Sequence, residues 1–224
     1  MKKKIVIVGL AAVLAATTIV GGSLAYFSAE GSKVQQQINT MTLAVDLQDV
    51  VRDAAGNEYG ATPADGKLVA ENVMPGEVIS KVMRVHNPEE VTEYVRVSIR
   101  KYWTKTSVSS NEVQKAVELD AKAIIVEPVN TDAAERERWI VLKETDEHII
   151  LYYTKPLAQG ESTKHFMEQV EISDKLQNVY ANKGITLEFE TDGVQMFAAQ
   201  DAFVSEWGVI PVLDEDGYIL EIHE

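Results

Sequence analysis

Cysteine is absent from this chain, and basic residues are few. With no Cys among 224 residues, the sequence excludes a disulfide scaffold, a thiolate metal site and a cysteine nucleophile. There are 21 lysines and arginines against 35 aspartates and glutamates, which gives a formal net charge of −14. The basic footprint that binds nucleic-acid phosphates is therefore missing. Aromatic residues make up only 7%, but the hydrophobic fraction of 46% is typical of a globular protein.

Catalytic motifs are missing as well. The four histidines, His86, His148, His165 and His223, form no His-Glu-x-x-His run, which would place two zinc ligands one turn apart on a helix. The sequence also has no Gly-x-Ser-x-Gly elbow and no phosphate-binding glycine loop. Each histidine is predicted to lie at the surface or at a strand edge; the alternative is that His148 and His165 converge from neighbouring strands. No catalytic, cofactor-binding or metal-ligating residue is predicted.

Two charged stretches receive structural interpretations. Asp214 to Gly217 is similar to part of a calcium loop, but the acidic positions do not continue in the required register. We predict a turn there, followed by a strand over 218–222, with calcium binding as the weaker alternative. Glu135 to Arg138 alternates in sign and predicts a solvated face.

The beginning of the chain has the pattern of a secretory signal. Three lysines at positions 2–4 precede an apolar run from Ile5 to Val20, and the small residues Ser23 and Ala25 follow. This order is typical of a cleaved signal peptide. We predict cleavage after Ala25, so that the mature chain begins at Tyr26 with a net charge of −17, three lysines fewer than the whole sequence. The alternative is an uncleaved single-span anchor, for which the apolar run is short.

The rest of the chain alternates with the period of β-strands. Apolar and polar residues alternate over 41–47, 91–99 and 185–190, which predicts half-buried strands. Residues 139–142 and 149–153 are apolar on both faces and predict central strands covered from both sides, and a further strand is predicted over 166–172. Turn signals separate these runs at 53–57, 62–66, 74–77 and 156–160.

Helix is the minority of the predicted structure. Ser109 to Glu112 has the spacing of a capping box, after which Val113, Ala116 and Val117 form a short apolar stripe. A second helix is predicted over 194–207, with Met196, Ala199, Phe203 and Trp207 as its buried stripe and Gly208 as its stop. We therefore predict an all-β fold: one jelly-roll-like β-sandwich over 40–224 with one or two short helices.

Several of these stretches together resemble one protein family. The junction Gly21–Ser28 is similar to export signals processed by the SipW-type signal peptidase of Gram-positive bacteria. In those signals, a cleavage site made of small residues is followed by aromatic residues. Further along, the similarity comprises a strand, a Pro-Gly turn, a strand followed by an Asn turn, a hairpin with Tyr-Tyr and Gly-Glu-Ser, and a closing strand with a helix: Met41–Leu47, Met74–Glu77, Val85–Glu89, Tyr152–Thr163 and Val194–Trp207. Together they resemble the family of TasA and camelysin.

The resemblance implies a jelly-roll protein secreted to the cell surface or extracellular matrix of a Gram-positive bacterium. TasA-like members assemble into biofilm matrix fibres, in which the mature N-terminal segment of one subunit completes the sheet of the next. The partners implied are other copies of the chain or related matrix subunits, and the SipW-type signal peptidase during export. Camelysin-like members carry a metallopeptidase label, but this sequence lacks the two-histidine helix, so the resemblance assigns no catalytic residue and no cofactor.

The segment predicted to follow the cleavage site, residues 26–39, has the composition of a donated strand. It carries three scattered large apolar residues, Phe27, Val34 and Ile38, too few to form a core of its own. Its backbone can pair with an open sheet edge, and head-to-tail pairing that does not close produces a filament. The alternative is a disordered terminus. We therefore expect a fibre subunit or fibre accessory; a surface metallopeptidase and a non-polymerising surface binding module are the competing hypotheses.

Overall fold

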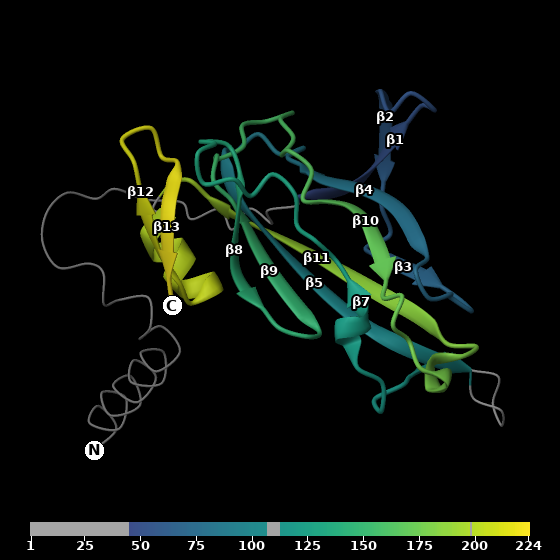
Figure 1. The fold of residues 1–224 in the computed structure, drawn as a ribbon. Helices are drawn as coiled ribbons and strands as arrows, with labels where there is room; N and C mark the ends of the chain where they lie inside the picture. The colour runs from purple at the N-terminus through teal and green to yellow at the C-terminus, as the bar shows by residue number, and fades with distance from the viewer. Residues whose placement is uncertain (1–44, 107–112, 198) are drawn as a thin grey trace, which may run out of the picture. The chain divides into compact units, whose positions relative to one another are not determined.

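Antiparallel strands dominate the structure and form two facing sheets (Figure 1). The computed structural model describes residues 45–106, 113–197 and 199–224, which belong to one compact unit. The predicted all-β sandwich is confirmed. Sheet A has the strand order β2-β1-β4-β10-β7, and its strands are β1 (Asp46–Arg52), β2 (Glu58–Pro63), β4 (Val78–His86), β7 (Ile124–Ile125) and β10 (Met167–Ile172).

Sheet B has the order β3-β11-β5-β9-β8, and a short strand β6 pairs with the far end of β5. The pairing of β5 with β11 runs without interruption from Gly184↔Thr104 to Gln195↔Glu93. These two strands connect β3 on one side of the sheet to β9 and β8 on the other. The strands are β3 (Lys67–Ala70), β5 (Glu93–Thr106), β6 (Val113–Lys115), β8 (Trp139–Glu144), β9 (His148–Tyr153) and β11 (Gly184–Gln195). Two 3-10 turns, η2 (Ala121–Ala123) and η3 (Asn178–Tyr180), lie between strands.

Alternate residues of the long strands fill the space between the sheets. Val95, Val97 and Ile99 of β5 are fully buried, as are Met83 and Val85 of β4 on the opposite sheet. Because successive side chains of a strand point to opposite faces, the period-two pattern in the sequence predicted the inward face of β5 correctly. The same holds for β11, whose inward residues join this core: Ile185, Leu187 and Phe189.

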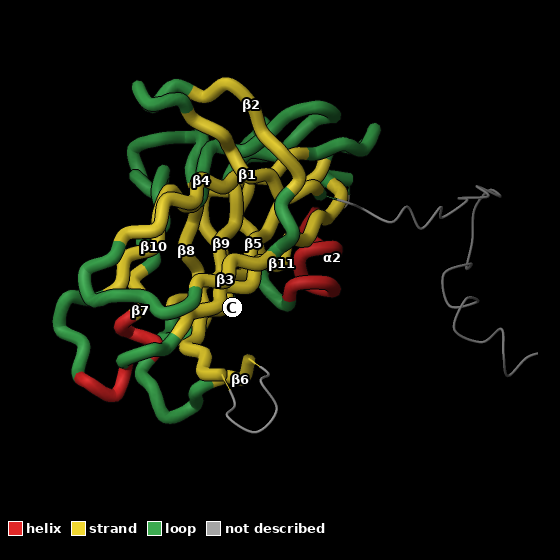
Figure 2. The backbone as a smooth tube through the Cα atoms, turned by 90° about the vertical axis from the view of Figure 1, so that its right-hand side faces the viewer, coloured by secondary structure: helices red, strands yellow, loops and turns green. Residues whose placement is uncertain are grey.

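A second core of aromatic rings lies on the outer face of sheet B. Tyr94 of β5 and Tyr152 of β9 point to that face and are covered by Phe203 and Trp207. The ring centroids of Tyr94 and Phe203 are 5.1 Å apart, and those of Tyr152 and Trp207 are 5.3 Å apart. The covering segment, residues 199–224, is called the C-terminal cover below. It consists of α2 (Ala199–Ala202), the π-helical turn η4 (Phe203–Trp207) and the hairpin of β12 (Ile210–Leu213) and β13 (Ile219–His223); α2 lies beside β11 in Figure 2.

The predicted turns at 53–57 and 74–77 are confirmed. In the first, Oδ1 of Asp53 accepts hydrogen bonds from the backbone N–H groups of Ala55 and Asn57, so the side chain stabilises the β1–β2 connection. In the second, the N–H of Glu77 donates to the carbonyl of Met74 (3.1 Å). Gly76 has φ = 75° there, a conformation that costs glycine little and other residues more.

The helix predicted over 194–207 begins later than expected. Val194 and Gln195 are the last residues of β11 and pair with β5, so the backbone ladder overrides the helical spacing of the side chains. The helical segment spans 199–207, and Met196 is 37% exposed rather than part of a buried stripe. The predicted stop at Gly208 is confirmed: this residue has φ = 68°, and its N–H donates to the carbonyl of Val204.

Two further predictions require correction. Strand β9 is covered on both faces as predicted, but β8 is the end strand of sheet B. Its outer-face residues Ile140 and Leu142 are apolar because they pack against the aromatic second core. The helix predicted after residue 112 is wrong, because Val113–Lys115 forms β6 on the edge of β5. The capping-box residues 109–112 and positions 41–44 of the first predicted strand lie outside the described residues; the strand itself, β1, continues to Arg52.

Candidate functional site

The strand ladder at one edge of sheet A breaks off beside β10. Strand β7 pairs with β10 only at Glu171↔Ile125 and Ile172↔Ile124. Two residues further along the same register, Glu127 would lie opposite Gln169. The chain instead leaves the sheet after Ile125 and returns at Val129, whose N–H donates to the carbonyl of Phe166 (3.1 Å). The outward edge of β10 therefore lacks a continuous strand partner between these two attachments.

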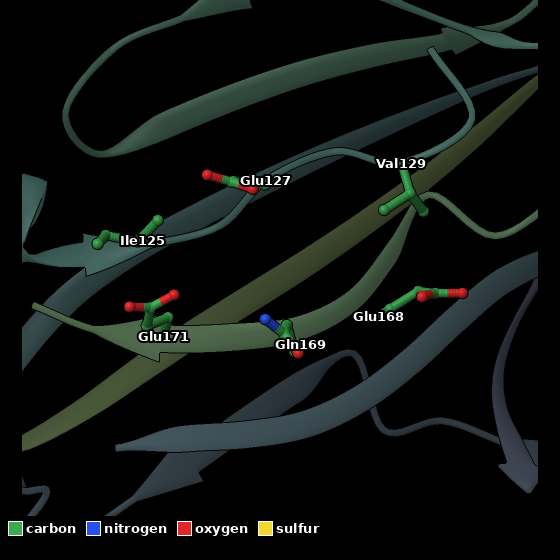
Figure 3. Close-up of a pocket in the computed structure, with 6 residues that line it drawn as sticks. All are labelled: Ile125, Glu127, Val129, Glu168, Gln169 and Glu171. Atoms are coloured by element: carbon green, nitrogen blue, oxygen red, sulfur yellow. The ribbon is translucent and has the colours of Figure 1, made fainter. Parts of the chain in front are cut away.

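A cavity of about 230 Å³ occupies this break. We call it the β10 gap and define it by its six lining residues, shown in Figure 3: Ile125, Glu127, Val129, Glu168, Gln169 and Glu171. Three come from the segment that leaves the sheet and three from β10. Pro128 lies in the middle of the departing segment and has no backbone N–H to donate to a ladder.

Carboxylates dominate the electrostatics of the β10 gap. Glu127 is exposed, Glu171 is half-buried, and Glu168 forms an ion pair with Arg52 of β1 (2.7 Å). The hydrogen bond from Arg52 holds the pKa of Glu168 below its ordinary value. No lysine or arginine is among the six lining residues. The gap therefore suits groups that donate hydrogen bonds, such as backbone or side-chain amides, and disfavours anions.

A network of charged side chains ties the β1–β2 hairpin to the start of β10. His165 contacts Oε1 of Glu58 through Nε2 (3.0 Å), and its Nδ1 lies 3.1 Å from Arg52. Glu58 also lies 3.8 Å from Arg84. Nδ1 of His165 also lies 3.5 Å from Oε1 of Glu168, which accepts a hydrogen bond from Arg52. The network therefore fixes the position of Glu168 at the gap.

The remaining histidines are dispersed. His148 begins β9 in sheet B, so it is not brought together with His165, which precedes β10 in sheet A. His86 hydrogen-bonds Ser162 (3.1 Å), and His223 lies 3.6 Å from Glu221. Within residues 45–106, 113–197 and 199–224, no group of three or more histidine, aspartate or glutamate side chains has an arrangement able to hold a metal ion.

The acidic stretch Asp214–Gly217 is the turn of the β12–β13 hairpin, as predicted. Its carboxylates are occupied by Arg136, which lies 2.8 Å from Asp214 and 2.5 Å from Asp216. The guanidinium also stacks 3.9 Å from the ring of Tyr218. Glu135 and Arg136 are exposed as expected, whereas Glu137 and Arg138 are half-buried. Arg136 also has a structural role that charge alternation alone did not predict, because its ion pairs hold the turn of the C-terminal cover.

The residues predicted for export and donation lie outside the described residues. They are the cleavage-site residues Ser23, Ala25 and Tyr26 and the donor-segment residues Phe27, Val34 and Ile38. Among the residues that the structure describes, no helix is long and apolar enough to cross a membrane. The β10 gap itself was not predicted; its one signal in the sequence is Pro128, a proline next to the short apolar run of β7.

Comparison with known proteins found no family model, no curated protein and no solved structure that matches this chain.

Proposed function

We propose that this protein is a secreted structural subunit of the cell surface or extracellular matrix of a Gram-positive bacterium. In this proposal, cleavage after Ala25 releases residues 26–39 as a segment that one copy donates to a sheet of the next. The observation that carries the proposal is the β10 gap, where a sheet edge has backbone groups without a continuous strand partner. The resemblance to the TasA and camelysin family supports the same function.

The dimensions of donor and acceptor are compatible. Strand β10 has six residues, of which Glu171 and Ile172 already pair with β7. The open stretch between the two attachments, residues 167–170, corresponds to about 13 Å of extended chain. The segment from Tyr26 to Asn39 has 14 residues, which is more than enough to pair with this stretch. The remaining residues bridge from the donated strand to the sandwich of the donor. An added strand would displace the segment around Pro128, which has few backbone hydrogen bonds to lose.

The chemistry of the segment also fits the gap. Residues 26–39 contain a lysine, Lys33, and three consecutive glutamines, Gln35–Gln37. Amide and ammonium groups donate hydrogen bonds to carboxylates, and the gap presents Glu127 and Glu171 for them. Because donor segment and acceptor edge are different parts of the chain, each copy can accept one neighbour and donate to another. Such a heterologous contact builds a filament when it does not close into a ring.

Electron microscopy of two purified versions tests this function. One version begins at Tyr26 and the other at Thr40, and both are concentrated under the same conditions. We expect filaments from the first and monomers from the second, because only the first has a segment to donate. Monomers from both versions would contradict polymerisation and favour a surface binding module. Chelator-sensitive proteolysis by either version would favour the metallopeptidase instead.

A further inference from the structure

The start of strand β5 contains a carboxyl group buried without a partner. Glu93 is fully buried, and its backbone is held on both sides. Its N–H donates to the carbonyl of Leu157 (3.0 Å), its carbonyl accepts from the N–H of Leu157 (2.8 Å), and it pairs with Gln195 of β11. Within the part of the chain that the structure describes, neither Oε1 nor Oε2 has a hydrogen-bond partner. A buried polar group in this state is costly, and an ionised one far more so.

The carboxyl group of Glu93 occupies space that a glycine leaves open. Gly193 of β11 lies directly beneath it: a Cβ atom built on Gly193 would overlap Oε2 of Glu93 and lie 3.3 Å from Cγ1 of Val45. Val45 immediately precedes β1, and its carbonyl lies 3.4 Å from Oγ1 of Thr191. The Glu93 side chain is therefore enclosed between the two sheets, where residue 45 enters sheet A.

The surroundings of Glu93 contain little that stabilises a negative charge. β11 presents Gly193 and Gln195 to it, the residue before β1 is Val45, and the 156–160 loop contributes Leu157. Among the described residues, the charged group that acts on Glu93 is Glu89, which is also an acid. Burial first, and then Glu89, raise the pKa of Glu93 from its ordinary 4.5 to about 7.

We propose that Glu93 is a proton-dependent clasp: the two sheets close over its neutral carboxyl group at Val45, and loss of the proton opens this end of the sandwich. This inference does not depend on the proposed function. Because the pKa of Glu93 is raised in the folded state, its neutral carboxyl group stabilises the closed sandwich fully below about pH 4.5. This stabilisation is lost as the pH rises through about 7. From these two pKa values, the equilibrium constant for closure falls by a factor on the order of 100 between pH 4 and pH 8.

Hydrogen–deuterium exchange on the full chain tests the clasp. Protection factors, corrected for the intrinsic exchange rate at each pH, are measured from pH 5 to pH 8 for peptides covering 45–52 and 91–97. We expect protection in these peptides to fall by tenfold or more across this range, while the far end of β5 around Trp103 keeps its protection. Glu93→Gln, which cannot ionise, is expected to show constant protection, and Glu90→Gln, an exposed glutamate in the same region, to behave like the unmodified chain.

A pH dependence in Glu93→Gln equal to that of the unmodified chain would overturn the proposal, as would constant protection in the unmodified chain. If Glu93→Gln does not fold, the carboxyl ¹³C resonance of Glu93 in the unmodified chain measures directly the protonation on which the clasp depends. A titration midpoint near 7 supports the clasp, and a midpoint near 4.5 overturns it.

Discussion

Replacing Phe203 with alanine is expected to release the C-terminal cover from sheet B. Phe203 is fully buried at the centre of the second core, and its ring lies within 5.1 Å of Tyr94 and 4.6 Å of Trp207, centroid to centroid. Removal of a buried aromatic side chain costs about 3–5 kcal/mol. Because the cover packs against only one face of one sheet, we expect this loss to be concentrated in residues 199–224. A red shift in Trp207 fluorescence, together with a lower Tm, measures it.

The neighbouring Phe197 provides a matched control. Its side chain is 78% exposed, so Phe197→Ala removes the same atoms with little loss of packing and is expected to change stability by less than about 0.5 kcal/mol. Equal Tm values for Phe203→Ala and the unmodified chain would contradict the assignment of Phe203 as the centre of the second core.

The second large effect is expected from Trp139→Ala. Trp139 is fully buried at the start of β8, with ring contacts to Tyr153 and Phe166. Its backbone N–H donates to Asn130 and its Nε1 to the carbonyl of Lys164. The substitution leaves a cavity and an unpaired carbonyl, which together cost about 3–5 kcal/mol of the free energy of unfolding. Because Asn130 adjoins the segment that frames the β10 gap, we also expect faster amide exchange at 126–130.

Chemical denaturation of Trp139→Ala, with Tyr59→Ala as the control, checks this expectation. Tyr59 lies on the end strand β2 with its side chain 71% exposed, so its truncation is expected to be nearly neutral. A loss of less than about 1 kcal/mol in the free energy of unfolding of Trp139→Ala would show that the core relaxes around the missing ring. It would also contradict the expected effect of Trp139 on the segment that frames the β10 gap.

The sequence was sufficient to predict those parts of the fold that follow from side-chain periodicity. Alternation in β5 and β11 identified the buried face of each strand, and Gly208 identified the end of the helix. Periodicity failed where hydrogen bonding between distant segments decides the structure. Val194 and Gln195 carry a helical pattern, but their ladder with β5 holds them in β11. The apolar faces of β8 indicated a central strand because the C-terminal cover, far away in the sequence, packs on it.

The candidate site was less predictable than the fold, for a physical reason. The β10 gap depends on the register between Ile125 and Glu171, and a single sequence does not specify the pairing of segments about 45 residues apart. The isolation of Glu93 likewise depends on which side chains β11 and β1 place around it. In the sequence, Glu93 is one acid among 35, and nothing local distinguishes it from an exposed one.

The most direct test of the proposed assembly uses the absence of cysteine. Every disulfide must then come from introduced residues, and bridging requires Cα atoms about 4.4–6.8 Å apart. One version beginning at Tyr26 carries Val34→Cys or Ile38→Cys in the donor segment, and a second carries Gln169→Cys at the β10 gap. Two donor positions are needed because a shift of one residue exchanges the faces of a strand. A control acceptor carries Val69→Cys on β3, a half-exposed position in the other sheet.

After mixing and mild oxidation, the products are separated on a non-reducing gel. We predict covalent dimers between the donor version and Gln169→Cys, with few or none to Val69→Cys. Equal yields with both acceptors, or no dimers from either donor position, would contradict donation of the N-terminal segment to the β10 gap.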